Sequence, residues 1–483
     1  MASTMAWAHK IFDGQWRTGG GGTLDVVAPA TAEVIATVGA ADVGDLDRAV
    51  AKAVSAQREW AAKPYTERAS VMTAAAALLA ADPERLSRWL VPESGSSQGK
   101  AGGEVQLVAA ELAEAANLAS QPYGQVLRSA KSRFSVGRYV PVGVVGVISP
   151  FNFPALLSMR SVAPALAVGN AVVLKPDPRT PISGGLALAE LFAEAGLPEG
   201  LLHVLPSGAD VGAALVAHPD VPCISFTGST SAGRRIGEAA APLLKKVHLE
   251  LGGNNAFLVL PDADISAAAS AGAWGSFLHQ GQICMASGRH LIPEHLAEEY
   301  IGKLAEIATR ITVGDPSDPS NALGPIIDEN QLKRVDGIVQ ATLTAGADLA
   351  AGGTYEDLYY RPTVLGNVPK DSPAFTEEIF GPVAPVTTYR TVDEAIDIVN
   401  SSEFGLSVSI LTANPFKAFE LADRIRSGAV HINDQTVDDE AVAPFGGVKS
   451  SGSGGHFGST VNLDTFCDLQ WVTMQSDIEK YPF

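Results

Sequence analysis

Cysteine is scarce in this chain of 483 residues. There are only three, Cys223, Cys284 and Cys467. An odd number at scattered spacing argues against a disulfide framework and favours a reducing compartment, so we expect a cytoplasmic protein. No group of cysteine and histidine residues has the spacing of a zinc site, and we therefore expect no metal.

Basic residues are also few. The chain has 34 lysines and arginines against 53 aspartates and glutamates, a net charge of −19. An acidic surface argues against nucleic acid or an anionic membrane as a partner. No apolar run is long enough to span a bilayer, and residues 1–14 lack the basic flank and apolar stretch of a secretory signal. What remains is a folded soluble protein, long enough for two or more domains.

Short apolar strands and helices alternate from about residue 142. One helix is expected from Pro154 to a stop at Gly169, and another over 183–195. The apolar strands predicted around them cover 142–149, 171–175, 201–206, 222–228 and 245–253. Continuous apolar strands joined by helices indicate a parallel sheet covered on both faces, which is a doubly wound α/β domain.

A second α/β unit is expected to start near residues 254–260. It continues through a helix at 264–279, a loop that carries Cys284, and further strands such as 430–433. Upstream of both units, residues 45–60 have the periodicity of a helix with Asp45 near its N-cap. The predicted fold class is therefore α/β, with two such domains.

Two segments, 132–139 and 468–475, fit neither unit because polar and apolar residues alternate along them. This period of two is typical of a half-exposed antiparallel strand, and an isolated hairpin is barely stable. Pairing of these strands across subunits would stabilise them, so we predict a homo-oligomer. A flap that pairs within one chain is the alternative.

Polar groups follow four strands of the predicted parallel sheet. Asn152 comes after the first strand, Lys175 after the second, the turn 226–233 after the fourth, and Glu250 after the fifth. Ligands of open parallel sheets bind beyond the carboxyl ends of the strands. We therefore expect an amide, an ammonium, a glycine-rich turn and a carboxylate to share one edge of this sheet.

The turn 226–233 and Lys175 each have two interpretations. The turn leads into a helix that starts near Ser229, and free amides at that end favour an anionic group such as pyrophosphate. However, the turn lacks the GxGxxG spacing, and an ordinary glycine-rich turn is the alternative. Lys175 at a strand end can simply be solvated, although an ammonium beside a phosphate turn suits a nucleotide ribose.

Three further residues are candidates for the chemistry itself. Glu250 lies between leucines, where desolvation raises the pKa of a carboxylate toward a general base's range, but it could be a surface acid. The Asn152 amide could stabilise an oxyanion or satisfy its own turn. Cys284 is either a nucleophile or a small buried core residue, whereas Cys223, inside a strand, is a core residue.

A set of motifs in this chain resembles those of the NAD(P)-dependent aldehyde dehydrogenase superfamily, in the same order and over nearly the whole length. The motifs are PFNFP (150–154), LKP (174–176), FTGSTSAG (226–233), LELGG (249–253), GQIC (281–284), EEIFGP (377–382) and PFGGVKSSGSG (444–454). Any one of them alone is weak, but LELGG, GQIC and EEIFGP at these separations are highly specific.

The resemblance implies a role for each candidate. Cys284 corresponds to the nucleophile, Glu250 to the general base and Asn152 to the oxyanion donor. The residues implied at the cofactor are Ser149, Phe151, Lys175, Pro178, Arg179, Gly208, Phe226, Gly228, Ser229, Leu251, Glu378 and Phe380. Among them, Lys175 matches the adenine-side ribose ligand, and Glu378 the nicotinamide-ribose ligand with Phe380 beside the ring.

The same resemblance implies an architecture. A Rossmann-type cofactor domain would cover 1–122 and 142–252, and a catalytic domain would cover 253–455. A small antiparallel bridging hairpin, made of 123–141 and 456–483, would build a homodimer or homotetramer.

The implied reaction has two halves. The Cys284 thiolate attacks the aldehyde, hydride leaves to the nicotinamide, and a thioester remains. Water activated by Glu250 then releases the free acid, whereas a branch that transfers to coenzyme A need not carry this glutamate. A thiol esterase is the alternative from another class, but no histidine is placed by any motif to activate Cys284.

Departures from the family pattern concern the cofactor and one histidine. The aromatic residue before the asparagine is often tryptophan, and here it is Phe151. His279 stands where many members have asparagine, and we interpret it as a structural hydrogen-bonding residue. NAD-preferring relatives usually carry a glutamate three residues after the lysine; here Pro178 and then Arg179 follow. Repulsion of a 2′-phosphate is absent and a guanidinium could meet it, so NAD and NADP are both expected.

The motifs look most like the benzaldehyde and vanillin dehydrogenase branch, which implies an aromatic aldehyde as substrate. The residues proposed to line an apolar substrate pocket are Phe153, Leu157, Ile283, Met285 and Phe445. Several of these could instead be core residues, and Arg160 could face either the pocket or solvent. An aliphatic aldehyde or a semialdehyde is the alternative substrate.

Overall fold

Five parallel strands form the centre of the first sheet, in the order β9-β8-β7-β10-β11, and β1, β2 and β21 extend it at its edges. The strands are β1 (Ile11–Phe12), β2 (Trp16–Arg17), β7 (Val144–Ile148), β8 (Ala171–Lys175), β9 (Leu202–Val204), β10 (Cys223–Thr227), β11 (Lys246–Glu250) and β21 (Gly452–Ser453). All five strands predicted from apolar runs are present, because each run is long enough to cross a buried sheet and is bounded by glycine, proline or polar residues.

The computed structural model describes residues 5–453 and 457–483. Residues 1–4, Gly454 of the last motif and the predicted boundary at 455/456 lie outside the described residues. Within the described part, no helix is long and apolar enough to cross a membrane.

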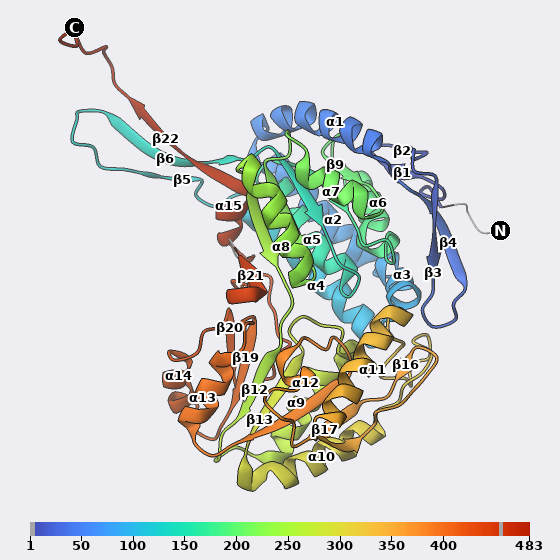
Figure 1. The fold of residues 1–483 in the computed structure, drawn as a ribbon. Coiled ribbons are helices and arrows are strands. Elements are labelled where there is room, and N and C mark those ends of the chain that lie inside the picture. Colours follow the sequence, from blue (N-terminus) through green and yellow to red (C-terminus); the bar gives the residue numbers. More distant parts are fainter. Residues whose placement is uncertain (1–4, 454–456) are drawn as a thin grey trace.

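Helices cover both faces of the first sheet (Figure 1). They are α1 (Val43–Ala62), α2 (Tyr65–Ala81), α3 (Glu84–Ser94), α4 (Gln98–Leu118), α5 (Pro154–Ala167), η1 (Ile182–Leu186), α6 (Ala187–Glu194), α7 (Ala209–Ala217), α8 (Thr230–Ala240) and η2 (Ala241–Leu243). Asp45 lies near the N-cap of α1, as predicted. Asp42 is the N-cap, and Asp45 is the third helical residue, which completes a capping box with it.

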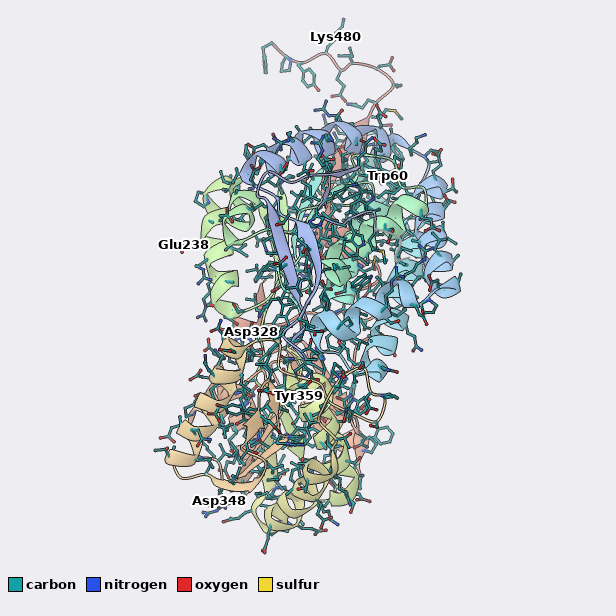
Figure 2. All side chains as sticks on the ribbon, turned by 90° about the vertical axis from the view of Figure 1, so that its right-hand side faces the viewer. Trp60, Glu238, Asp328, Asp348, Tyr359 and Lys480 are labelled. Carbon is teal, nitrogen blue, oxygen red and sulfur yellow. The ribbon has the colours of Figure 1, made fainter. Side chains whose placement is uncertain are left out.

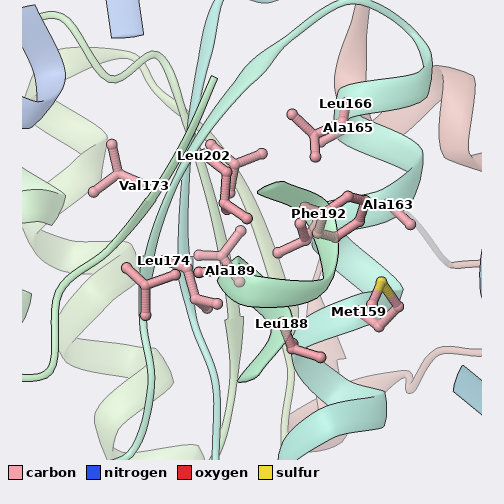
Figure 3. Packing of buried hydrophobic residues seen from close by; sticks show 14 of the residues in the cluster. Met159, Ala163, Ala165, Leu166, Val173, Leu174, Leu188, Ala189, Phe192 and Leu202 are labelled. Atoms are coloured by element: carbon pink, nitrogen blue, oxygen red, sulfur yellow. The ribbon is translucent and has the colours of Figure 1, made fainter. Parts of the chain in front are cut away.

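The core of this unit lies between the central strands and α5 and α6 (Figure 3). Met159 and Leu166 of α5 and Phe192 of α6 pack beside Leu174 of β8 and Leu202 of β9, all of them buried. Because α5 is buried along its whole length, the turn that precedes it is held rigidly at the carboxyl end of β7.

The second sheet has seven strands in the order β14-β17-β18-β13-β12-β19-β20, parallel except for the β14–β17 edge. Its strands are β12 (Asn255–Val259), β13 (Ser287–Pro293), β14 (Asp348–Ala351), β17 (Thr363–Gly366), β18 (Val383–Tyr389), β19 (Ser407–Leu411) and β20 (Ala429–Ile432). The helical segments of this unit are α9 (Ile265–Phe277), η3 (Leu278–Gly281), η4 (Glu294–Leu296), α10 (Ala297–Arg310), α11 (Glu329–Thr344), α12 (Pro373–Thr376), α13 (Val392–Ser401) and α14 (Pro415–Ala422). The predicted second α/β unit is therefore present.

Small hairpins complete the fold. They are β3 (Thr23–Val27) with β4 (Val34–Gly39), and β15 (Tyr355–Glu356) with β16 (Tyr359–Tyr360). Two short helical segments, η5 (Lys449–Ser451) and α15 (Val461–Phe466), lie near the C-terminal end of the chain.

A three-stranded flap projects from the first unit (Figure 1). It consists of β5 (Gly124–Val126), β6 (Phe134–Pro141) and β22 (Cys467–Met474). β22 pairs antiparallel with β6 from Cys467↔Pro141 to Met474↔Phe134. The two alternating segments therefore pair with each other inside one chain, which was the alternative expectation. A partner subunit is not needed to pair them.

The predicted domain boundaries stay a prediction. The strand β21 does not follow these boundaries. It falls in the range assigned to the catalytic domain, but it pairs with β11 of the first sheet.

Candidate active site

One cavity of about 390 Å³ lies between the two α/β units, at the carboxyl ends of β7, β8, β10 and β11. Its lining residues come from both units. They are Ile148, Ser149, Pro150, Phe151, Asn152, Leu157, Lys175, Asp177, Arg179, Phe226, Thr227, Gly228, Ser229, Ala232, Glu250, Leu251, Gly252, Cys284, Gln331, Arg334, Glu378, Phe380 and Phe445. Glu250 and Asn152 thus share one space, as the positions of strand ends predict, and Cys284 lines the same space.

Asn152 lies in the buried turn between β7 and α5 and is only 3% exposed. Its Nδ2 donates a hydrogen bond to the carbonyl of Gln282, 2.9 Å away, in the loop before the cysteine. An amide NH2 carries two N–H groups, so a second donor is left for another acceptor. The same bond fixes the Asn152 turn relative to the loop of Cys284.

Cys284 follows η3 in a loop whose backbone is held by Asn255 of β12. The Asn255 Nδ2 donates to the carbonyl oxygens of Cys284 and Ala286, at 2.8 and 2.9 Å. Burial, together with the nearby carboxylates of Glu378 and Glu250, raises the pKa of the Cys284 thiol to about 12. The resting thiol is therefore neutral near neutral pH, and a nearby base must remove its proton before it can attack.

The other two cysteines lie elsewhere. Cys223 is fully buried in β10, as expected for a core residue, and Cys467 is 4% exposed where β22 begins. Neither lines the cavity.

Glu250 is the last residue of β11 and is 4% exposed. Its Oε1 lies 2.9 Å from Nε2 of His248, and its Oε2 accepts from the backbone N–H of Gly447 at 3.3 Å. Sequence reasoning missed His248. Its position two residues before Glu250 on a strand, and hence on the same face, was the signal that could have revealed it.

The glycine-rich turn has the predicted geometry for an anion. Ser229 is the N-cap of α8, and its hydroxyl accepts from the backbone N–H of Ala232 at 3.3 Å. Lys175 is the last residue of β8, which β7 separates from β10 in the sheet, and it is 7% exposed. Burial lowers the pKa of its ammonium, while the nearby Asp177 and Asp210 raise it. A helix N-terminus and an ammonium in one cavity suit the phosphates and ribose of a dinucleotide.

At the other end of the cavity, Glu378 approaches the backbone of Gly252 very closely. A Cβ at Gly252 would lie 2.2 Å from the Glu378 carboxylate, so a larger residue there would displace this side chain. The N–H of Gly253 donates to Glu378 Oε1 at 3.1 Å. A carboxylate held over a glycine backbone fits a ribose hydroxyl, and the residues present therefore fit a nicotinamide dinucleotide.

Arg179 does not offer a free guanidinium to a 2′-phosphate, and this corrects the expectation from the sequence. Its guanidinium is bound by both oxygens of Asp177, at 2.9 and 2.8 Å, and by Asp328 at 2.7 Å. It also stacks on the ring of Phe151, 4.1 Å from the ring centroid. Figure 2 shows Asp328 where the two units meet, so Arg179 links them.

Several predicted residues lie near the cavity without lining it. Pro178 and Gly208 belong to the cofactor set, and Gly208 is the N-cap of α7. Phe153, Ile283 and Met285 belong to an apolar cluster with Leu406, against which Cys284 and Phe445 of the cavity lining also pack. Leu157 and Phe445 are the two proposed substrate-pocket residues that do line it.

His279 and Arg160 are both buried. The His279 ring packs edge-on against Phe153, with 5.6 Å between ring centroids, and burial lowers its pKa well below the usual range, so it is neutral. Arg160 faces neither solvent nor cavity. It forms a buried ion pair with Glu111 and Asp439, and its guanidinium lies 4.7 Å from the ring centroid of Phe445.

Residues 16–472 match the aldehyde dehydrogenase family. The chain belongs to this family. It is 54% identical to a vanillin dehydrogenase of an Amycolatopsis species and 48% identical to the NAD(+) benzaldehyde dehydrogenase of Pseudomonas putida, in each case covering 99% of this chain and 98% of the relative. A solved Pseudomonas syringae aldehyde dehydrogenase, complexed with NAD+ and octanal, has a TM-score of 0.92 and 36% identity over 96% of both chains.

Family membership confirms the recognised superfamily, the fold class and the enzyme class expected from the motifs. The roles of individual residues stay predictions, although the cavity brings most of them together. In the ranges 5–453 and 457–483, no three histidine, cysteine, aspartate or glutamate side chains form a group that could hold a metal ion.

Proposed function

We propose that the protein oxidises an aromatic aldehyde to the carboxylic acid, with NAD+ or NADP+ as hydride acceptor. The observation that carries this is the convergence of Cys284, Glu250 and Asn152 on one cavity, beside a helix N-terminus and an ammonium. A thiol, a carboxylate and an amide supply a nucleophile, a general base and an oxyanion donor.

In the first half of the reaction, a base other than Glu250 takes the proton of the Cys284 thiol, and the sulfur bonds to the aldehyde carbon. The oxygen that becomes negative accepts a hydrogen bond from the Asn152 amide. The nicotinamide ring, when bound, takes up the hydride that this carbon releases. A thioester on Cys284 remains.

In the second half, water hydrolyses the thioester. The water oxygen bonds to the acyl carbon while its proton passes to the Glu250 carboxylate. The carbon–sulfur bond then breaks, which frees the acid and restores Cys284. Glu250 is buried and hydrogen-bonded at both oxygens, so it is held in place for this transfer.

Lys175 and the first turn of α8 would hold the phosphates and the adenine-side ribose, and Glu378 the nicotinamide-side ribose. Both nucleotides remain candidates, because Pro178 brings no carboxylate against a 2′-phosphate. Since Arg179 is already paired with two carboxylates, Lys175 is a cation better placed to meet such a phosphate.

The aromatic substrate is supported by two lines of argument. The relatives with 54% and 48% identity are named for vanillin and benzaldehyde. Phe151, Leu157 and Phe445 also give the cavity an apolar wall that suits a flat ring. An aliphatic aldehyde is the second candidate, because a solved relative contains octanal.

We further propose that the protein acts in the cytoplasm as a homodimer or homotetramer. The flap supports assembly, because Leu469 and Trp471 of β22 are 70% and 63% exposed. Large apolar side chains on an edge strand are a common interface between copies of a chain.

A substrate panel tests the proposal. Benzaldehyde, vanillin, hexanal and succinic semialdehyde would each be offered with NAD+ and with NADP+, while the absorbance of reduced nicotinamide is followed. We expect kcat/KM to be highest for the aromatic aldehydes, and no turnover in a Cys284→Ala variant that still binds cofactor. Preference for the charged semialdehyde would overturn the aromatic assignment. Hydrolysis of an aryl ester without any nicotinamide signal would indicate a thiol esterase.

A further inference from the structure

His248 is buried directly beside Glu250. Both side chains come from β11, two residues apart, and so lie on the same face of the strand. They are 3% and 4% exposed, and 2.9 Å separates His248 Nε2 from Glu250 Oε1. When Glu250 is ionised, as a general base must be, its carboxylate can only accept, and the imidazole then donates from Nε2.

Neighbouring side chains hold the imidazole ring of His248 in position. The ring of Phe457 packs edge-on against it, with 4.2 Å between centroids and 65° between the planes. The other ring nitrogen, Nδ1, has no hydrogen-bond partner among the described residues. Glu250 is thus the polar partner that fixes the tautomer of His248, and His248 in turn fixes the Glu250 carboxylate.

Another hydrogen bond to Glu250 is longer. The backbone N–H of Gly447 lies 3.3 Å from Oε2, at the weak end of the range for such bonds. His248 therefore supplies the shorter of these two hydrogen bonds. A glutamate side chain has several rotatable bonds, and an unheld carboxylate would spend part of its time in other rotamers.

We propose that His248 is a positioning residue for the hydrolytic half of the reaction. Its hydrogen bond to one Glu250 oxygen holds the carboxylate so that the group takes its proton from the attacking water in one fixed orientation. His248 neither gains nor loses a proton in this step. The inference rests on the proposed role of Glu250 as the general base.

The test separates acylation from hydrolysis. Enzyme and NAD+ would be mixed rapidly with benzaldehyde; the burst of reduced nicotinamide reports acylation, and mass spectrometry of quenched samples reports the decay of the Cys284 acyl-enzyme. The variants are His248→Phe, which keeps a ring against Phe457 but has no donor, and His248→Gln, which keeps a donor. His203→Phe is the matched control, because His203 is also buried in the first sheet, on β9, and its Nε2 lies 2.9 Å from the Gly200 carbonyl, away from Glu250.

We expect His248→Phe to leave the burst rate within about threefold of the wild type but to slow acyl-enzyme decay by about tenfold or more, because a misoriented base loses much of its effect. His248→Gln should recover most of this loss, and His203→Phe should not slow decay. Acyl-enzyme decay at the wild-type rate in His248→Phe would overturn the inference. So would equal losses in burst and decay, or no difference between the Phe and Gln variants.

A Glu250→Gln variant keeps the two assignments apart. If it turns over normally, the role proposed for Glu250 fails. If it stalls as acyl-enzyme while His248→Phe does not, the role of Glu250 stands and that of His248 falls.

Discussion

The ammonium of Lys100 donates a hydrogen bond to the backbone carbonyl of Asn152, with 2.7 Å between Nζ and O. Lys100 is on α4 and also lies 2.5 Å from Glu104 Oε2 and 4.1 Å from the ring centroid of Phe153. The second oxygen of Glu104 accepts from the first backbone amides of α5. This buried pair therefore holds the Asn152 turn from both ends.

Replacing Lys100 with methionine should separate stability from positioning. The Glu104 carboxylate would be left buried without its cation, which we expect to lower the free energy of unfolding by about 3–5 kcal/mol. The Asn152 turn would also lose a hydrogen bond, so kcat should fall by about tenfold or more. Denaturant unfolding and steady-state kinetics measure the two effects.

The double variant Lys100→Met/Glu104→Gln is the control for this prediction. It removes the unpaired charge but keeps an oxygen for the amides of α5, so most of the lost stability should return. Because the bond to the Asn152 carbonyl is still missing, kcat should stay low. Recovery of kcat together with stability would show that Lys100 has no role beyond folding.

The reactivity of Cys284 should depend steeply on pH. Its pKa is raised to about 12, so the thiolate fraction, and with it the rate of alkylation by iodoacetamide, should rise about tenfold per pH unit between about pH 7 and 10 without a plateau. The rate is measured by mass spectrometry in the absence of cofactor. A plateau near pH 8 would contradict the raised pKa.

Glu378 should account for part of this effect. Its negative charge raises the pKa of the thiol, so Glu378→Gln should lower that pKa and speed alkylation at a fixed pH. Burial raises the pKa of Glu378 itself to about 7, and the comparison should therefore be made above about pH 8, where Glu378 is ionised. A Cys284→Ser variant reports any labelling of the buried Cys223 and Cys467.

The residues found from the sequence are those that follow strands directly. Asn152, Lys175 and Glu250 come within four residues of a strand's last residue or are that residue, and parallel strands deliver their ends to one edge. The residues that hold the Asn152 turn in place, Lys100 and Glu104, were not predicted. They reach the site through the packing of α4 against α5, and no local sequence pattern encodes this packing. His248 could have been found, since it shares a face of β11 with Glu250.

The sequence also did not predict which side chains face the cavity or which strands pair with each other. A turn rich in aromatics does not reveal which ring faces a cavity: Phe151 lines the cavity, whereas Phe153, proposed for the substrate pocket, packs in the apolar cluster that also includes Cys284. Alternation predicted both flap strands correctly but not that β6 and β22 pair with each other. The same pattern suits any antiparallel partner.

Asp177 should limit the use of NADP. It lines the cavity, engages Arg179 through both oxygens and acts electrostatically on Lys175. Its charge opposes a 2′-phosphate near Lys175, so Asp177→Asn should raise the ratio of kcat/KM for NADP+ to that for NAD+ by about tenfold at low salt. Addition of salt should reduce this gain. An unchanged ratio would show that the phosphate, if bound, lies out of reach of Asp177.

Arg160 connects three separate segments behind the substrate wall. Its guanidinium pairs with Glu111 of α4 and with Asp439 in the loop after β20, and it faces the ring of Phe445, 4.7 Å from its centroid. Phe445 lines the cavity, whereas Arg160 does not. Both charges also act on the pKa of the Cys284 thiol, Arg160 lowering it and Asp439 raising it, which places the pair within electrostatic reach of the reacting atom.

Arg160→Lys should therefore weaken the preference for aromatic substrates. Lysine keeps the positive charge acting on Cys284 but cannot stack flat on Phe445 or span both carboxylates. We expect kcat/KM for benzaldehyde to fall by about tenfold, mainly through KM, while that for propanal, too short to depend on a ring wall, changes by less than about threefold. Arg289→Lys is the matched control, because Arg289 is equally buried and faces Phe375, which does not line the cavity. Equal losses for both aldehydes in Arg160→Lys, or the same selective loss in the control, would show that Arg160 supports the fold rather than the substrate wall.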